Sequence, residues 1–145
     1  RIIQIIHLPR HRGEDYKVDL MKKIEFNDIA PHLIVTDVVA SAAFYKDSLG
    51  FDFNRFWGEP PNFVILFRGS VQLMLSQDSI KAPQPLQNGR FDAYIWLNQG
   101  IDQLFDEYKQ KEIEIIEPLE TTFFQMQQFL IKDNNGYILC FGQEV

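Results

Sequence analysis

The stretch LIVTDVVASAAFYKDSLGF, residues 33–51, carries the clearest structural pattern in the chain. It continues a string of β-type residues, so the sequence predicts a strand over 29–35. Asp37 then offers a side-chain oxygen that can cap a helix, and apolar residues recur at helical spacing over 39–49. Gly50 follows where the end of a helix favours a left-handed residue. The stretch therefore predicts a strand, a helix and a defined helix end.

Three further β-type stretches complete the first half of the chain. They are FDFNRFW at 51–57, NFVILFRG at 62–69 and SVQLMLSQ at 70–77. Turn signals separate them, with Gly-Glu-Pro-Pro after the first stretch and a Gly-Ser pair between the second and the third. The first half therefore predicts the order βαβββ.

The second half repeats this order after a linker. Prolines, a glycine and polar residues mark residues 78–89 as that linker. The Asn-Asn-Gly sequence at 134–136 predicts a type I′ hairpin turn. The predicted elements of this half are a strand over 91–98, a helix over 101–111, and strands over 112–118, 123–133 and 137–143.

Recurring residues support a duplication. Tyr45 is followed by lysine in the first predicted helix, as Tyr108 is in the second, and Gly69 recurs as Gly136 at nearly the same offset. A slowly changing offset indicates loop insertions in a duplicated unit. We therefore predict one domain of two modules over 21–145. Residues 1–20 are interpreted as an N-terminal extension that is either foreign to the natural protein or poorly ordered.

Composition excludes several classes of protein. The 145 residues carry a formal net charge of −6, whereas nucleic-acid binding is led by clustered Lys and Arg. No apolar run approaches the roughly 20 residues of a membrane-spanning helix. The single cysteine, Cys140, excludes an intrachain disulfide and favours a reducing, cytoplasmic compartment. We therefore expect neither nucleic acid nor membrane as a partner, and the 13 Phe suggest that some aromatic residues line a pocket.

The stretch at 33–51, the Asp-Asn-Asn-Gly-Tyr turn and the doubled βαβββ order together resemble the vicinal oxygen chelate superfamily. That superfamily includes glyoxalase I, bleomycin resistance proteins, fosfomycin-modifying thiol transferases and extradiol dioxygenases. The likeness covers about residues 26–143. It implies an α+β fold in which two modules, at about 26–77 and 90–143, curl mixed sheets around a cleft. It also implies a homodimer, with the modules pairing within one chain or between two.

The resemblance further implies where a divalent metal would bind, with one ligand from each of four strands. The corresponding residues here are Ala30, Met74, Asp92 and Cys140. A slip of one or two residues would put Gln72 or Ser76 in place of Met74, and Gln143 or Glu144 in place of Cys140. A catalytic site of this kind needs at least three nitrogen or oxygen donors, and alanine has none. We therefore expect no metal and no cofactor, in the manner of the bleomycin-resistance-like members, which keep the cleft without the metal.

A count of histidines agrees with this expectation. His32 is the single histidine after Met21, whereas the two-histidine dioxygenases and the thiol transferases need two. Those chemistries are excluded. Glyoxalase I chemistry would need paired glutamates as metal ligand and base, and this chain has none at the expected positions. An enzymatic alternative stays open: a divergent lyase or isomerase that uses a metal through Asp92, Gln72 or Glu144, or that uses His32 without a metal.

Side chains alternate across a strand, so residues at even separation from a ligand position share its face. This face is apolar and aromatic with a few hydrogen-bonding groups, which is typical of a small-molecule pocket and also of a plain sheet core. Trp57 and the residues at 123–126 lie where they could close over a ligand or pack in a dimer. The predicted ligand-binding residues are His32, Trp57, Gln72, Met74, Asp92, Tyr94, Trp96 and Cys140.

Individual side chains carry separate hypotheses. His32 can bond a ligand or act as a base, or it is a histidine bonded to the backbone. Asp92 beside Trp96 suits a cation, or it is a surface charge near the strand. Cys140 is interpreted as an inert buried thiol rather than a nucleophile.

The sequence thus predicts a metal-free protein of the bleomycin-resistance type, related in character to antibiotic resistance proteins. It would sequester an aromatic or amphipathic molecule, neutral or cationic. A dimeric interaction module with no small-molecule role is the remaining alternative.

Overall fold

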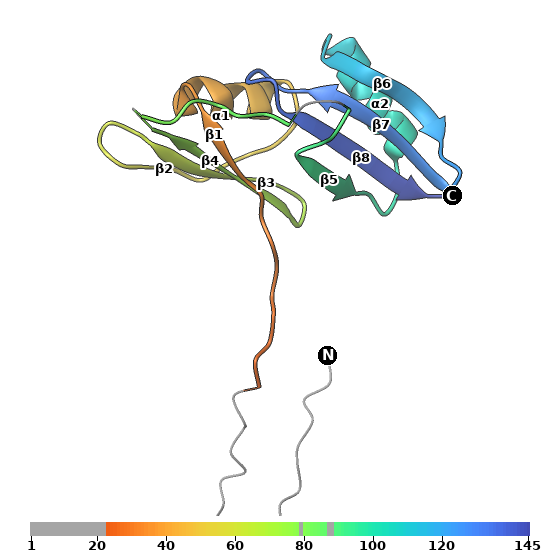
Figure 1. The fold of residues 1–145 in the computed structure, drawn as a ribbon, viewed down its shortest axis with the longest axis horizontal. Helices are drawn as coiled ribbons and strands as arrows, with labels where there is room; N and C mark the ends of the chain where they lie inside the picture. Colours follow the sequence, from red (N-terminus) through yellow and green to blue (C-terminus); the bar gives the residue numbers. More distant parts are fainter. Residues whose placement is uncertain (1–22, 79, 87–88) are drawn as a thin grey trace, which may run out of the picture.

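The computed structural model describes residues 23–78, 80–86 and 89–145 (Figure 1). The extension expected over 1–20 lies outside the described residues. The elements of the first half are β1 (His32–Val35), α1 (Val38–Asp47), β2 (Phe56–Trp57), β3 (Phe63–Arg68) and β4 (Val71–Gln77). Those of the second half are β5 (Ala93–Trp96), α2 (Ile101–Gln110), β6 (Glu114–Thr121), β7 (Met126–Lys132) and β8 (Ile138–Glu144).

The elements form two four-stranded sheets with the same topology. Their strand orders are β1-β4-β3-β2 and β5-β8-β7-β6. In each sheet the first strand is parallel to the last, and the remaining pairs are antiparallel. The predicted α+β fold of two βαβββ modules with mixed sheets is therefore confirmed.

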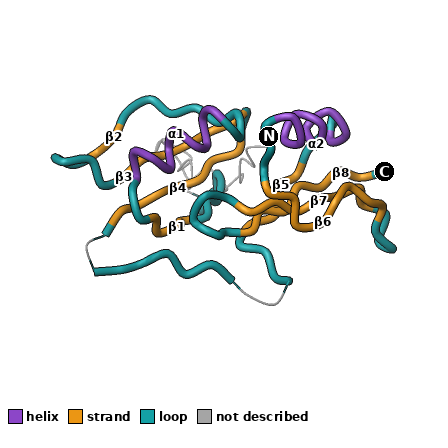
Figure 2. The backbone as a smooth tube through the Cα atoms, turned by 90° about the horizontal axis from the view of Figure 1, so that it is seen from above, coloured by secondary structure: helices purple, strands orange, loops and turns teal. Residues whose placement is uncertain are grey.

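The two sheets lie side by side, and both helices lie on the same side of them (Figure 2). One hydrophobic cluster runs through both modules on this side. It includes Leu33 and Leu75 of the first sheet, Leu139 and Phe141 of the second, and the fully buried Tyr45 of α1. The modules therefore share one core, and neither described helix is long and apolar enough to cross a bilayer.

The predicted signals at the ends of α1 are confirmed. The Asp37 side chain accepts hydrogen bonds from the N–H groups of Val39 and Ala40, both at 3.0 Å, which is the expected N-cap. After the helix, Gly50 has φ +76, and the N–H of Phe51 donates to the Tyr45 carbonyl. The cap and the glycine explain why the helix has these limits.

Several predicted strands are shorter than expected, among them those over 29–35 and 91–98, and turns interrupt two others. Over 51–57 the structure has only the two-residue β2, preceded by a single bridge between Asp52 and Phe67. Over 123–133 the strand begins at Met126, because Phe123 and Phe124 lie in the hairpin turn before it. Both aromatic stretches have strand propensity, but turns interrupt them.

The predicted type I′ turn at 134–136 is wrong. That turn needs positive φ at both central residues, whereas in this hairpin only Gly136 has it, with φ +88. The reason is the buried Asp133, whose Oδ1 accepts the N–H groups of Asn135 and Tyr137 at 2.8 and 2.9 Å. These bonds hold a wider turn, because Asp side chains bond to the backbone two residues on.

Candidate functional site

Each sheet has one face that α1 or α2 covers and one face that neither helix covers, which we call the open face. Alternation along the strands and the pairing register define its residues. On the first sheet they are His32, Ile34, Trp57, Phe63, Ile65, Phe67, Gln72, Met74 and Ser76. On the second sheet they are Tyr94, Trp96, Gln128, Leu130, Lys132, Ile138, Cys140 and Gly142.

The predicted ligand-binding residues divide between these two faces. His32, Trp57, Gln72 and Met74 lie on the first sheet. Tyr94, Trp96 and Cys140 lie on the second, and Asp92 lies just before β5. Both helices lie on one side of the two sheets, so the two open faces lie on the other side (Figure 2).

On the first sheet, His32 is exposed and bonded to a side chain rather than to the backbone. Its Nε2 lies 2.6 Å from the hydroxyl oxygen of Ser76, and its ring lies 6.4 Å from that of Phe63. An exposed imidazole beside a hydroxyl can donate or accept a hydrogen bond, depending on its tautomer. The interpretation of His32 as a histidine bonded to the backbone is therefore not what the structure shows.

Trp57 lies at the outer edge of the first sheet and is 46% exposed. The guanidinium carbon of Arg55 stacks over its ring at 3.8 Å from the ring centroid. This cation–π contact occupies one face of the indole and places a positive charge at the edge of the open face. That charge disfavours a cationic ligand at this end of the first sheet.

On the second sheet, three aromatic rings lie in a row, one just before β5 and two on it. Ring centroids are 5.6 Å apart for Phe91 and Tyr94, and 4.8 Å apart for Tyr94 and Trp96. The Tyr94 hydroxyl donates to Oε1 of Gln128 at 3.0 Å, and burial raises the pKa of this hydroxyl. Trp96 is 63% exposed, so much of its indole surface is not covered by the residues that the structure describes.

Gly142 makes room for this aromatic row. A Cβ atom built on Gly142 would overlap the hydroxyl and ring of Tyr94. The absence of a side chain therefore allows the Tyr94 ring to approach the backbone of β8 at Gly142.

Asp92 is engaged by the backbone rather than facing a ligand. Its Oδ1 accepts the N–H of Leu86 at 3.1 Å, and its Oδ2 accepts the N–H of Ile138 at 2.8 Å. Both oxygens therefore help to fix the preceding loop and the start of β8. The structure gives Asp92 a positioning contact that the sequence did not reveal.

Cys140 is fully buried, in a small cluster with Leu130 and Ile138. Burial raises the pKa of its thiol to about 12, and the negative charge of Glu117 adds to the effect. A protonated, inaccessible thiol is a poor nucleophile and a poor metal ligand. The interpretation of Cys140 as an inert thiol fits this environment.

The four family ligand positions do not fit a divalent metal. Ala30 has no donor, Met74 offers only a thioether, and Cys140 is a buried thiol with a raised pKa. Asp92 already accepts two backbone N–H bonds. Among the described residues, no three His, Cys, Asp or Glu side chains are grouped so that they could hold an ion.

An acidic edge on the second open face was not predicted from the sequence. The register pairs Glu117 with Leu130 and Glu120 with Gln128, which puts both glutamates on the open face. Glu114 on the same strand pairs instead with Lys132, at 3.5 Å. The density of glutamate in EIEIIEPLE was the available signal, but a bulge shifts the register within β6, so simple alternation misplaces the residues.

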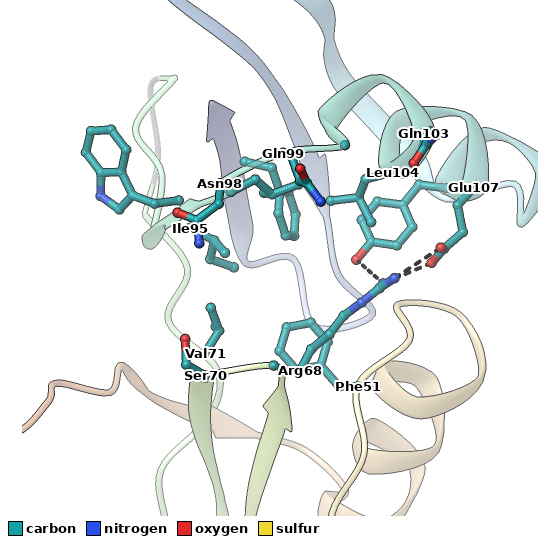
Figure 3. A pocket seen from close by; sticks show the side chains of 16 residues that line it. Phe51, Arg68, Ser70, Val71, Ile95, Asn98, Gln99, Gln103, Leu104 and Glu107 are labelled. Carbon is teal, nitrogen blue, oxygen red and sulfur yellow. Dashed lines mark hydrogen bonds and ion pairs between the residues drawn. The ribbon is translucent and has the colours of Figure 1, made fainter. Parts of the chain in front are cut away.

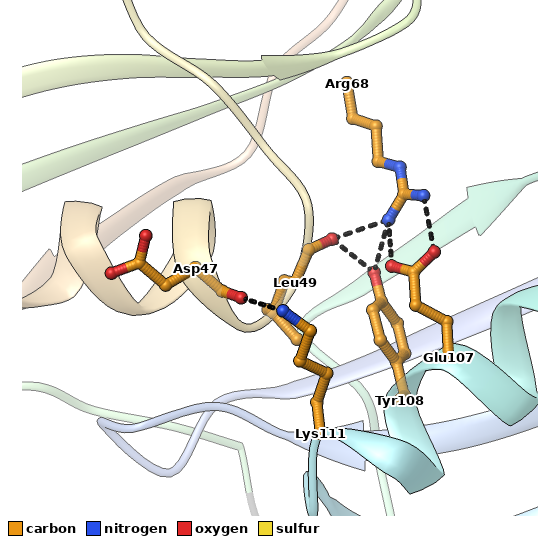
Figure 4. Close-up of polar contacts among 6 residues, drawn as sticks. All are labelled: Asp47, Leu49, Arg68, Glu107, Tyr108 and Lys111. Atoms are coloured by element: carbon orange, nitrogen blue, oxygen red, sulfur yellow. Dashed lines mark hydrogen bonds and ion pairs between the residues drawn. The ribbon is translucent and has the colours of Figure 1, made fainter.

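A cavity of about 430 Å³ between the two modules was not predicted from the sequence either. The turn between β3 and β4 forms one wall, and the connection from β5 to α2 forms the other (Figure 3). At one end Arg68 pairs with Glu107, with N–O distances of 2.9 and 3.1 Å. Both Arg68, at 2.7 Å, and the Tyr108 hydroxyl, at 2.8 Å, donate to the Leu49 carbonyl (Figure 4).

Comparison with known proteins gives the wider context. No curated protein sequence matches the chain. Several solved structures share its fold. They include TioX from Micromonospora sp. ML1, with 16% identity and a TM-score of 0.67, for which the match covers 83% of this chain and 100% of that one.

Two further structures are similar over a comparable length. The virulence protein STM3117 from Salmonella typhimurium has 25% identity and a TM-score of 0.61, over 84% of this chain and 100% of its own. The bleomycin-binding protein from Streptomyces verticillus, in complex with copper(II)-bleomycin, has 22% identity and a TM-score of 0.61, over 84% of this chain and 98% of its own.

The family assignment rests on sequence as well as fold. The family model for this superfamily matches residues 25–141, which is most of the chain and spans both modules. The paired βαβββ topology described above is the same in kind as that of the matched structures. The chain therefore belongs to the glyoxalase/bleomycin resistance protein/dioxygenase superfamily.

Proposed function

We propose that this protein binds an aromatic or amphipathic small molecule without a metal, and that the ligand is neutral or cationic. The observation that carries the proposal is the second open face, where an aromatic edge and an acidic edge flank the same surface. Tyr94 and Trp96 supply the rings on β5, and Glu117 and Glu120 supply the charges on β6. Aromatic faces and carboxylates together attract an organic cation.

The alternative function, that of a lyase or isomerase, is less well supported for a physical reason. A lyase or isomerase of this superfamily that uses a metal would need at least three donors, and the four family positions provide none that is both free and suitable. His32 with Ser76 is the remaining candidate for acid–base chemistry without a metal. It stands on the first sheet, apart from the aromatic and acidic edges of the second.

We propose that a second copy of the chain covers the exposed parts of the open faces, where Trp57 and Trp96 are 46% and 63% exposed. Besides Trp96, several apolar side chains are exposed, among them Phe124 at the hairpin before β7. Ile24 and Phe26, in the extended stretch before β1, are 89% and 88% exposed. We infer that these exposed apolar side chains contribute to the surface between the two copies. We propose a homodimer, with a cytoplasmic location.

The experiment compares three naphthalene probes of one shape and different charge: 2-naphthylmethylamine, 2-naphthalenemethanol and 2-naphthoate. Calorimetric titration should show that the amine and the alcohol bind and that the naphthoate binds at least about tenfold more weakly, a difference of about 1.4 kcal/mol. Trp96→Ala should weaken both ligands, and Glu117→Gln should weaken the amine alone. Asp106→Asn, on the exposed surface of α2, is the matched control for a lost charge and should change nothing.

Two results would contradict the proposal. One is tighter binding of 2-naphthoate than of the amine. The other is a stoichiometric divalent metal in protein purified without a chelator, measured by elemental analysis. If no probe binds while sedimentation shows a stable dimer, the interaction module without a small-molecule role is the better assignment.

A further inference from the structure

We propose that the cavity between the modules is a second binding site, which takes a neutral, planar heteroaromatic molecule independently of the open faces. Its volume of about 430 Å³ lies within the range of small-molecule pockets. It lies on the side of the sheets that carries the helices, since its lining includes Leu104 and Tyr108 of α2 and the core residues Ile95 and Phe141.

The corresponding corner of the first module is filled. There the turn between β7 and β8 reaches across to β1 and α1. The Tyr137 hydroxyl donates to the Ile34 carbonyl at 2.7 Å. Asn135 accepts the N–H of Thr36 at 3.2 Å and donates to the Ser41 hydroxyl at 2.8 Å. Side chains of this turn therefore occupy the space between the modules on that side.

The second module has the same corner without the filling. Val71 takes the place of Tyr137, since each lies three residues before a family ligand position, Met74 or Cys140. Gly69 offers no side chain, and a Cβ built there would meet no atom within 4 Å. A large aromatic residue in one module is thus replaced by a small one in the other, and the cavity is what remains.

The start of α2, beside the cavity, also lacks a side chain that the start of α1 has. α1 begins after Asp37, whose side chain bonds two N–H groups, whereas α2 begins after Gly100, which gives no such bond. Gln77 and Gln143 supply the same additional bond in the two modules, to the N–H groups of Val38 and Ile101. The modules therefore match closely around this corner. The positions of the side chains that the second corner lacks, Val71 and Gly100, lie beside the cavity.

The lining sets the chemistry of the ligand. The floor is apolar, with Phe51, Ile95 and Phe141 almost fully buried beneath the cavity. Such a floor favours a flat ring system, because aromatic surfaces stack or pack edge to face. The rim beside α2 carries the exposed amides of Gln99 and Gln103, and each amide both donates and accepts hydrogen bonds.

The charges in the cavity cancel. The Arg68 guanidinium donates hydrogen bonds to the Glu107 carboxylate and the Leu49 carbonyl. The ion pair with Glu107 raises the pKa of this guanidinium. A charged ligand would therefore lose hydration without gaining an unpaired counter-charge. A neutral heteroaromatic molecule can pack its ring on the apolar floor and exchange hydrogen bonds with the amides at the rim.

The test uses the full chain and three quinoline probes. Quinoline-3-carboxamide is neutral, and quinoline-3-carboxylate and 3-(aminomethyl)quinoline are its charged analogues. A ¹H–¹⁵N NMR titration should show saturable shifts at the amides of Val71, Gly100 and Gln103 for the carboxamide. A fragment of this size should have a Kd of about 1 mM. At these same cavity amides the charged analogues should bind at least about fivefold more weakly, whatever they do at the open faces.

Variants locate the binding. Val71→Tyr copies the residue that fills the first module and should abolish the shifts. Gln103→Trp, at an exposed position of the first turn of α2, should block the cavity without touching the core. The matched control is Gln110→Trp, at an exposed position at the end of α2 outside the cavity lining, which should leave the carboxamide titration unchanged. Trp96 is not a discriminating position, since it lines the cavity and also contacts Tyr94 on the open face.

The outcomes separate this proposal from the proposed function. Saturable shifts confined to open-face residues, unchanged in Gln103→Trp, would overturn the cavity site while leaving open-face binding intact. Absence of saturable shifts for the carboxamide would overturn it whatever the naphthalene probes do. Shifts of the cavity residues that appear on raising the protein concentration without any probe would overturn it too, since a second copy would then fill the cavity.

Discussion

Two buried tyrosines, one in each helix at matching positions, should respond differently to the loss of their hydroxyl groups. Tyr45 and Tyr108 are both fully buried. The Tyr45 hydroxyl donates to Oδ2 of Asp133 at 2.6 Å, and the Tyr108 hydroxyl donates to the Leu49 carbonyl at 2.8 Å. We expect Tyr45→Phe to lower the free energy of unfolding more than Tyr108→Phe.

The difference follows from what each acceptor keeps. Without Tyr45, Oδ2 of Asp133 loses its donor, because the two backbone N–H groups bond to the other oxygen, Oδ1. A hydrogen bond to a charged group contributes about 1.5–3 kcal/mol, so we expect a loss of about 2 kcal/mol. Without Tyr108, the Leu49 carbonyl keeps Arg68 at 2.7 Å, and the expected loss is about 1 kcal/mol.

The pH dependence gives the same reasoning a second test. Burial raises the pKa of Asp133 above its ordinary value, and the hydrogen bond from Tyr45 opposes that increase. Tyr45→Phe removes the opposing bond and raises the pKa further. A raised native pKa means that the folded variant takes up the proton before the unfolded chain does, so its stability recovers as the pH falls. The penalty of Tyr45→Phe should therefore shrink below neutral pH.

The assay is urea denaturation, in which the change in free energy is read from the shift of the midpoint at an unchanged slope. Measurements at pH 7 and at successively lower pH cover both tests. Equal losses for the two variants, or a larger loss for Tyr108→Phe, would refute the reasoning about the acceptors. A penalty of Tyr45→Phe that grows as the pH falls would refute the reasoning about the Asp133 carboxyl.

Three further predictions concern other parts of the chain. Removing the helix cap with Asp37→Ala should cost about 1 kcal/mol of unfolding free energy, measured by urea denaturation, and a loss near zero would show that other groups satisfy the helix end. Cys140 should react with a thiol reagent such as DTNB only at the rate of unfolding, and fast labelling of the folded protein would contradict its burial. Asp92→Ala should leave the N–H groups of Leu86 and Ile138 without their acceptor and so speed proteolysis of the 78–89 linker, whereas Asp28→Ala, at an exposed position before β1, should not.

The fold could be predicted from the sequence because its signals are local and repeated. The cap at Asp37, the glycine after α1 and the recurrence of these features in the second half depend on neighbouring residues alone. Alternation along the strands also placed His32, Met74 and Trp96 on faces that no helix covers. Along strands without a bulge, period-2 alternation transfers directly from sequence to structure, whereas the bulge in β6 breaks it.

The parts that could not be predicted depend on groups distant in the sequence or on the backbone. Asp92 looked like a ligand because its oxygens had no visible partners, and those partners are backbone N–H groups. The turn at 134–136 follows the bonds of Asp133 instead of the preference of its own residues. The cavity arises from the difference between Val71 and Tyr137, which is plain in the sequence but has no meaning until the modules are packed together.

The core that the modules share has a consequence for the chain as a folding unit. Tyr45, Tyr108 and Tyr137 each make a hydrogen bond to the other half, and one apolar cluster crosses the boundary. A chain nicked between β4 and β5 should therefore hold its two fragments together, and neither fragment should stay native after separation. Either half alone would expose the apolar surface that now lies against the other half, and it would need a second copy of itself to cover that surface.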